Sequence, residues 1–94
     1  MTKRAEYIET MKHQLDELNT NMNTLAAKAH DVKEDARDKY KEQVSKLRQQ
    51  SRLAVAKLDE MKASSEYSWD AMVAEMEKVR DAFKHSCSYF KSQL

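Results

Sequence analysis

The chain of 94 residues contains no glycine and no proline, and only 7% of its residues are aromatic. Sheets need turns, and turns usually place glycine or proline at special backbone dihedrals, so the absence of both predicts an all-α fold. After Lys3 and Arg4 there is no apolar run of the kind that forms a signal peptide or a membrane span. We therefore expect a helical protein of the cytoplasm.

The chain also has only one cysteine and almost no net charge. The single Cys87 excludes an intramolecular disulfide framework and a metal site built from several cysteines. Seventeen Lys and Arg against sixteen Asp and Glu leave a net charge of +1, which removes the global argument for nucleic acid or an anionic membrane as partner. Charged residues make up 35% of the chain, a composition that also occurs in disordered proteins.

What the sequence does have is a long apolar stripe. Its residues recur in steps of three and four, which is the heptad spacing of a coiled coil. They are Ile8, Met11, Leu15, Leu18, Met22, Leu25, Ala29, Val32, Ala36, Tyr40, Val44, Leu47, Ser51, Ala54, Leu58 and Met61. Because disordered chains have no reason to keep a period, this stripe predicts one continuous helix over about 3–62 within a single domain.

Two stretches weaken that helix without ending it. The run Asn19–Thr24 is poor in helix formers and costs roughly 2 to 3 kcal/mol relative to alanine, but the apolar spacing continues through it. Between Val32 and Val44 the apolar steps are four, four and four, which is a stutter that locally straightens a supercoil. We interpret the first as a soft point and the second as a change in supercoiling.

A chain reversal is expected at about 63–68, where serines compete with the helix through their own hydrogen bonds and can cap a new one. A second helix is then expected over about 69–92. Its apolar stripe consists of Trp69, Met72, Val73, Met76, Val79, Phe83, Cys87, Phe90 and Leu94.

The two helix lengths predict an oligomer. A helix of about 60 residues is roughly 90 Å long and one of about 25 residues roughly 37 Å, so the second covers only the part of the first from about Asp38 to Met61. The uncovered part needs a partner, most simply a second copy in a homodimer. The expected oligomer interface is Ile8, Met11, Leu15, Leu18, Met22, Leu25 and Val32. The expected intrachain packing residues are Tyr40, Val44, Leu47, Leu58, Met61, Trp69, Met72, Met76, Val79, Phe83 and Phe90.

Three segments resemble a group of small bacterial coiled-coil proteins. They are the opening YIETMKHQLDELN at 7–19, the middle YKEQVSKLR at 40–48 and the SWD of the tail at 68–70. Members of that family look similar to this chain almost from end to end. The resemblance implies a coiled-coil fold and a bacterial source, but no reaction.

Candidate catalytic and metal-binding residues are few. His13, His30 and His85 each lie four residues from an acid, Glu9, Glu34 and Asp81 respectively, which is a workable spacing for two metal ligands on a helix. Acids are so frequent that chance explains the pairs, and we expect solvated histidines and no cofactor. Cys87 lies on the apolar side of the tail, where a buried small hydrophobe is favoured over a reactive thiol or an intermolecular disulfide.

Two binding surfaces remain as alternatives. A basic stretch, made of Lys39, Lys41, Lys46, Arg48, Arg52 and Lys57, contains one acid, Glu42, but lacks the interleaved aromatic side chains that stack on bases, so nucleic acid is disfavoured. The amphipathic tail from Trp69 to Leu94 suits a membrane surface, although its four acids balance four bases. We therefore expect a non-enzymatic coiled-coil protein that acts by self-association or by binding a protein partner, with peripheral membrane or lipid binding as the alternative.

Overall fold

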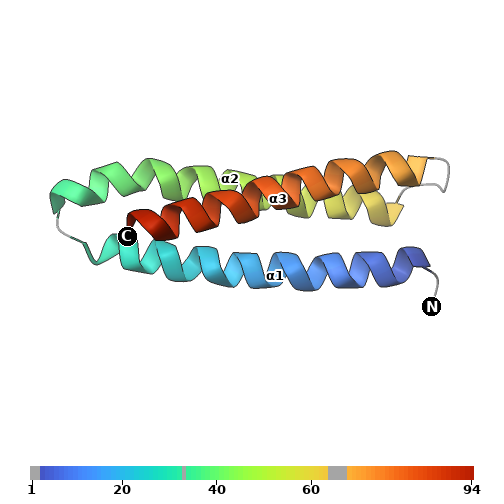
Figure 1. The fold of residues 1–94 in the computed structure, drawn as a ribbon, viewed down its shortest axis with the longest axis horizontal. Coiled ribbons are helices and arrows are strands. Elements are labelled where there is room, and N and C mark those ends of the chain that lie inside the picture. Colours follow the sequence, from blue (N-terminus) through green and yellow to red (C-terminus); the bar gives the residue numbers. More distant parts are fainter. Residues whose placement is uncertain (1–2, 33, 64–67) are drawn as a thin grey trace.

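The computed structural model describes residues 3–32, 34–63 and 68–94, apart from the side chains at 35 and 36. These ranges form three helices, α1 (Lys3–His30), α2 (Glu34–Ala63) and α3 (Trp69–Gln93), in an elongated bundle of 50 × 20 × 18 Å (Figure 1). α1 and α3 run in the same direction and α2 runs opposite to both (Figure 1). The predicted all-α fold class is confirmed.

The expectation of one continuous helix over 3–62 is wrong, because α1 ends at His30 and α2 begins at Glu34. The amide of Asp31 still donates to the carbonyl oxygens of Ala27 and Lys28, at 3.3 and 3.2 Å, and closes the last turn of α1. The break costs a few backbone hydrogen bonds at about 1 kcal/mol each, whereas burying one Leu or Met side chain is worth about 1.5–3 kcal/mol. Folding α1 back against α2 is therefore favoured, because it buries the whole apolar stripe of α1.

The stretch over 19–24 stays helical, as the apolar spacing predicted. The hydroxyl of Thr20 donates to the carbonyl oxygen of Asp16 at 3.0 Å, and that of Thr24 donates to the carbonyl oxygen of Thr20 at 3.1 Å. On the α2 side, Ser51 donates a hydrogen bond to the side-chain oxygen of Asn19. Polar side chains that disfavour an isolated helix are thus satisfied within α1 and across to α2.

The core runs along the axis of the bundle and is built from all three helices. Phe83, Phe90, Met61 and Met76 have no exposed surface, and Met11 retains 1%. Within the described residues no polar or charged side chain is buried. The other buried core residues are Leu15, Met22, Leu25, Ala29, Leu47, Ala54, Leu58 and Cys87.

α3 occupies Trp69–Gln93, where a helix over about 69–92 was expected, and it lies along α2 from end to end. Near one end Lys57 pairs with Glu75, and at the other the hydroxyl of Tyr40 donates to the carbonyl oxygen of Gln93 at 2.8 Å. The expected reversal at about 63–68 falls largely on residues 64–67, which lie outside the described residues. Among the described helices, none has a stretch long and apolar enough to cross a membrane.

Replacing Phe83 by alanine is predicted to lower the free energy of unfolding by about 3–5 kcal/mol. The ring is fully buried in the core, so its removal leaves a cavity. Leu53, which is 62% exposed, provides the control: Leu53→Ala is expected to change stability by less than about 0.5 kcal/mol. Urea unfolding followed by far-UV circular dichroism measures both. Equal losses for the two variants would contradict this core.

Candidate protein-binding groove

A groove runs between the two parallel helices α1 and α3. Its volume is about 750 Å³, and it extends from Gln14 and Arg80 to Lys28 and Lys91. α1 and α3 each pack against α2, and the side chains between them leave this space unfilled. The remaining lining residues are Glu17, Leu18, Asn21, Thr24, Leu25, Asp81, Lys84, Cys87 and Ser88.

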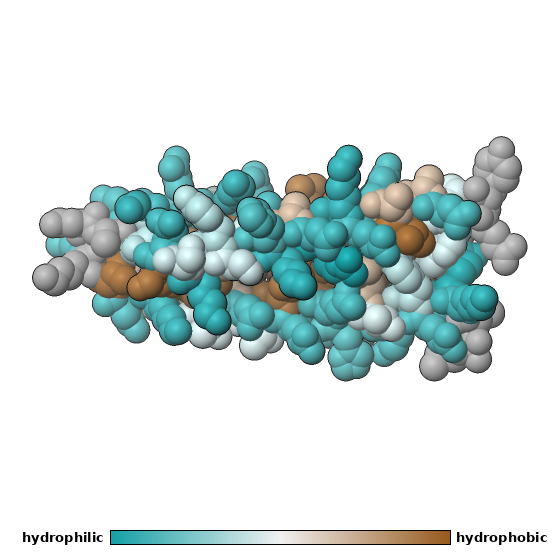
Figure 2. Space-filling model, viewed as in Figure 1, coloured by the Kyte–Doolittle hydropathy of each residue, from teal (hydrophilic) through white to brown (hydrophobic). Residues whose placement is uncertain are grey.

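The floor of the groove is apolar. Leu18 is half-buried, while Leu25 and Cys87 are 5% and 6% exposed and belong to the core. Figure 2 shows hydrophobic surface at places along the line between α1 and α3, with hydrophilic surface on both sides. A floor of this kind offers contact to an apolar side chain that enters the groove.

Arg80 organises the rim near the N-terminal halves of the helices. Its guanidinium donates to the side-chain oxygen of Gln14 at 2.9 Å and to the Asp81 carboxylate at 3.0 and 3.1 Å. The contact with Gln14 is the polar bridge between α1 and α3 at this point. Arg80 is therefore held in place and its charge is already compensated.

The other half of the rim is cationic. Lys28 comes from α1, and Lys84 and Lys91 come from α3; all three are exposed. None of them forms an ion pair within the described ranges. Three uncompensated ammonium groups therefore border an apolar floor.

Aromatic contacts close the bundle beyond the groove. At the N-terminal end the rings of Tyr7 and Trp69 meet edge to face at 5.6 Å, and the guanidinium of Arg4 lies 4.8 Å from the Trp69 ring. Burial, and next the charge of Glu77, raise the pKa of Tyr7. At the far end Tyr40 and Phe90 meet in the same manner at 5.5 Å. The first contact joins α1 to α3, and the second joins α2 to α3.

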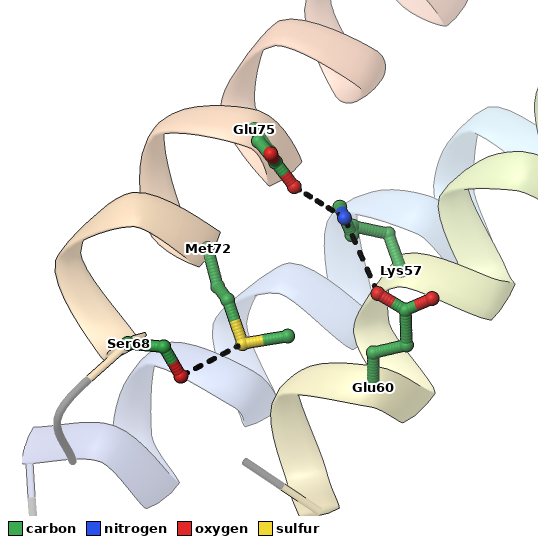
Figure 3. A network of polar contacts seen from close by, with 5 residues as sticks. All are labelled: Lys57, Glu60, Ser68, Met72 and Glu75. Atoms are coloured by element: carbon green, nitrogen blue, oxygen red, sulfur yellow. Dashed lines mark hydrogen bonds and ion pairs between the residues drawn. The ribbon is translucent and has the colours of Figure 1, made fainter. Parts of the chain in front are cut away.

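The face between α2 and α3 carries a different polar network (Figure 3). Lys57 pairs with Glu75 of α3 and with Glu60 of its own helix, the latter at 3.2 Å, and the hydroxyl of Ser68 contacts the sulfur of Met72 at 3.9 Å. The hydrogen bond from Lys57 lowers the pKa of Glu75, and the same bond raises the pKa of Lys57. Lys57 is thus bound by two carboxylates, and these contacts join α3 to α2.

A second hollow, of about 610 Å³, lies between the end of α1 and the start of α2. Alanines at 26, 27 and 29 together with Val44 line it, and His30, Asp38, Arg37, Lys41 and Arg48 surround it. It adjoins the turn between the helices, and its apolar lining consists of small side chains, three alanines and the half-buried Val44, with no leucine among the described lining residues. We regard the groove between α1 and α3 as the stronger candidate.

The residues expected to form an oligomer interface lie inside the single chain. Met11, Leu15, Met22 and Leu25 are buried, Ile8 and Leu18 are partly buried against the core, and Val32 is half-buried. The uncovered stripe that motivated the homodimer does not exist, because the turn after α1 brings α2 and α3 over it. Of that set, Leu18 and Leu25 also reach the groove.

All the expected intrachain packing residues lie in the core. Leu47, Leu58, Met61, Met76, Phe83 and Phe90 are buried, and the remaining five, namely Tyr40, Val44, Trp69, Met72 and Val79, are partly buried against them. Cys87 is buried, as expected for a small hydrophobe. No three His, Cys, Asp or Glu side chains gather into a metal-binding cluster in the part of the chain that the structure describes.

Sequence reasoning missed the groove itself. Its rim residues Gln14, Asn21, Lys28, Lys84 and Lys91 are polar and occur on helix faces that a heptad pattern assigns to solvent. A signal was present nonetheless. After Glu17 there is no acid up to His30, and after Asp81 there is none up to Gln93, an unusual gap in so charged a chain.

We predict that Cys87 reacts slowly with a thiol reagent in the folded protein. Burial raises the pKa of the thiol, so little thiolate forms, and the neighbouring side chains restrict access. The rate is expected to rise on the order of a hundredfold in urea, because reaction requires local opening. Absorbance after addition of an aromatic disulfide measures it. Equal rates in the folded and unfolded states would contradict the placement of Cys87.

The contact between Lys57 and Glu75 predicts a pH dependence of stability. Because the pKa of the Glu75 carboxyl is lowered in the folded state, its contribution is present above the ordinary carboxyl pKa and is lost as the pH falls through the folded value. Glu75→Gln should therefore be less stable than the parent at neutral pH and equal to it in acid. Glu9→Gln, on an exposed turn of α1, is the control and should show no such gap. Urea titrations across the pH range test this, and a gap that persists in acid would contradict it.

No protein-family model, no curated protein and no solved structure matches this chain. The resemblance to small bacterial coiled-coil proteins therefore stays a prediction. A function for this chain is therefore inferred from the groove and from the residues that line it.

Proposed function

We propose that this chain is a non-enzymatic protein of the cytoplasm that acts by binding a helix of another protein in the groove between α1 and α3. The observation that carries the proposal is the combination of an elongated groove, an apolar floor and a polar rim. An amphipathic helix laid into a hydrophobic groove is a recurring mode of peptide recognition, in which residues spaced by three and four supply the anchors.

The dimensions suit such a ligand. Fourteen residues separate Gln14 from Lys28, which corresponds to about 21 Å along α1. A partner segment of about four turns therefore spans the groove. Its apolar side chains would contact Leu18, Leu25 and the carbon atoms of Cys87, and its flanks would meet the polar rim.

The chemistry of the groove supports binding in preference to catalysis. The one thiol that lines it belongs to Cys87, whose pKa is raised by burial, so the nucleophilic thiolate is disfavoured. Arg80 is engaged by Gln14 and Asp81. The other lining groups include the ammonium groups of the lysines, the Glu17 carboxylate and the hydroxyls of Thr24 and Ser88, and the described lining residues include no histidine and no activated thiol.

Two other modes of action require the bundle to open. Self-association through the stripe from Ile8 to Val32 would take Met11, Leu15 and Met22 out of the core. Membrane binding through the apolar face of α3 would do the same to Phe83 and Phe90. Binding a helix in the groove leaves the core intact, and for that reason we place it first.

A peptide titration tests the proposal. The probe is a 16-residue amphipathic peptide with leucines at positions spaced by three and four and with neutral glutamine and serine elsewhere. Followed by amide NMR spectra of the protein, it is expected to shift signals around Leu18, Asn21 and Ser88. Asn21→Trp, which fills the groove above its floor, should abolish these shifts, whereas Ser45→Trp, on an exposed turn of α2, should preserve them.

The competing modes give different results in the same experiment. Shifts spread over core residues of all three helices would indicate opening of the bundle. An absence of shifts, or shifts that survive Asn21→Trp, would contradict the groove as a binding site.

A further inference from the structure

We infer that the groove selects a helix that is acidic in its N-terminal half and that binds antiparallel to α1 and α3. This inference rests on the proposed function and adds the charge and the direction of the partner. Three features carry it: the distribution of charge along the groove, the direction of the two helices that form it, and the poor fit of a second copy.

Charge is distributed unevenly along the groove. From Leu18 to His30 in α1 and from Ala82 to Gln93 in α3 there is no acid, whereas the cations Lys28, Lys84 and Lys91 lie in these same segments. The next acid, Asp31, directly follows α1 and does not line the groove. The two acid-free segments lie side by side because α1 and α3 are parallel (Figure 1). One half of the groove is therefore cationic, while Glu17 and Asp81 lie at the other half. Carboxylates on a bound helix are favoured beside the three lysines.

The directions of α1 and α3 add a second preference. Both helices end beside the cationic half, so the negative ends of two helix dipoles lie there. A bound helix is favoured when its positive N-terminal end lies at that place. Acidic residues are themselves favoured in the first turns of a helix. Charge and dipole thus point to the same arrangement, with the acidic N-terminal half of the partner between Lys28 and Lys91.

A second copy of this chain fits the groove poorly. A symmetric dimer with the two grooves parallel would bring the lysines of both copies together. With the grooves antiparallel the lysines would face Glu17 and Asp81 of the other copy, but Arg80 already binds Asp81, and two facing hollows leave the space between them unfilled. The acid-rich starts of α1 and α3 do not serve as the ligand either, since their apolar faces fill the core through Met11 and Met76. The occupant that fits is a helix of a different protein.

Charge-matched peptides test the partner's chemistry. Two versions of the neutral probe carry either glutamate or lysine at the flanking positions of the first two turns. At low ionic strength the glutamate peptide should bind about tenfold or more tightly than the lysine peptide, and the difference should shrink in high salt because the lysines are exposed. Isothermal titration calorimetry measures the dissociation constants.

Matched variants assign the effect to the groove. Lys84→Glu combined with Lys91→Glu should reverse the preference in favour of the lysine peptide. Lys46→Glu combined with Lys78→Glu, which makes the same change in net charge away from the groove, should leave the preference unchanged. All four lysines are exposed, so the core is preserved in both variants, and circular dichroism verifies this.

The direction is read from a nitroxide label at the N-terminus of the glutamate peptide. It should broaden the amide signals around Lys28 and Lys91 and spare those around Gln14. Broadening around Gln14 would overturn the antiparallel arrangement, and equal affinity of the two charged peptides would overturn the charge preference.

The neutral peptide distinguishes failure of this inference from failure of the proposed function. If it binds while glutamate and lysine peptides do not differ, the proposed function stands and this inference fails. If no peptide binds, both fail. Sedimentation of the protein alone tests whether a second copy occupies the groove. If the protein forms a dimer, and if Lys84→Glu combined with Lys91→Glu alters that dimer, then a second copy is the occupant and the inference is overturned.

Discussion

Burial of the apolar stripe of α1 by the other two helices is the constraint on which the structure depends. The stripe includes Met11, Leu15, Met22 and Leu25, all of which are buried. At about 1.5–3 kcal/mol for each side chain, their burial far exceeds what the turn after His30 loses in backbone hydrogen bonds. The bundle, its dimensions and the place of its groove follow from that balance.

The groove follows from the way in which the burial is shared. α2 packs against both of its neighbours, and polar or aromatic contacts such as those of Ser51 and Tyr40 fix it to them. Between α1 and α3 the guanidinium of Arg80 donates a hydrogen bond to Gln14, and further along the groove the two helices carry Lys28, Lys84 and Lys91. The charge preference that we infer for the groove depends on these lysines.

The sequence predicts the helices and the core better than it predicts their connection. The absence of glycine and proline indicates an all-α fold, and spacing identifies core residues as distant as Leu47 and Phe90. The turn after His30 was missed because the apolar period continues from Ala29 to Val44 without a breaker, so local sequence does not distinguish a bend from a stutter. The groove was missed because it depends on how far two helices separate, which is a property of packing and not of spacing.

The turn between α1 and α2 also has a consequence for assembly. No residue in the described ranges has a positive φ, and the turn contains neither glycine nor proline. Apart from the hydrogen bond from the Arg37 guanidinium to the carbonyl oxygen of Val32 at 3.5 Å, burial of the apolar stripe favours the bend, because a straight helix through this point violates no backbone preference. At high concentration two chains can form the same core by exchanging their first helices. In each chain the bend would then open into one continuous helix. Such an exchange would use the continuous helix that the heptad spacing describes.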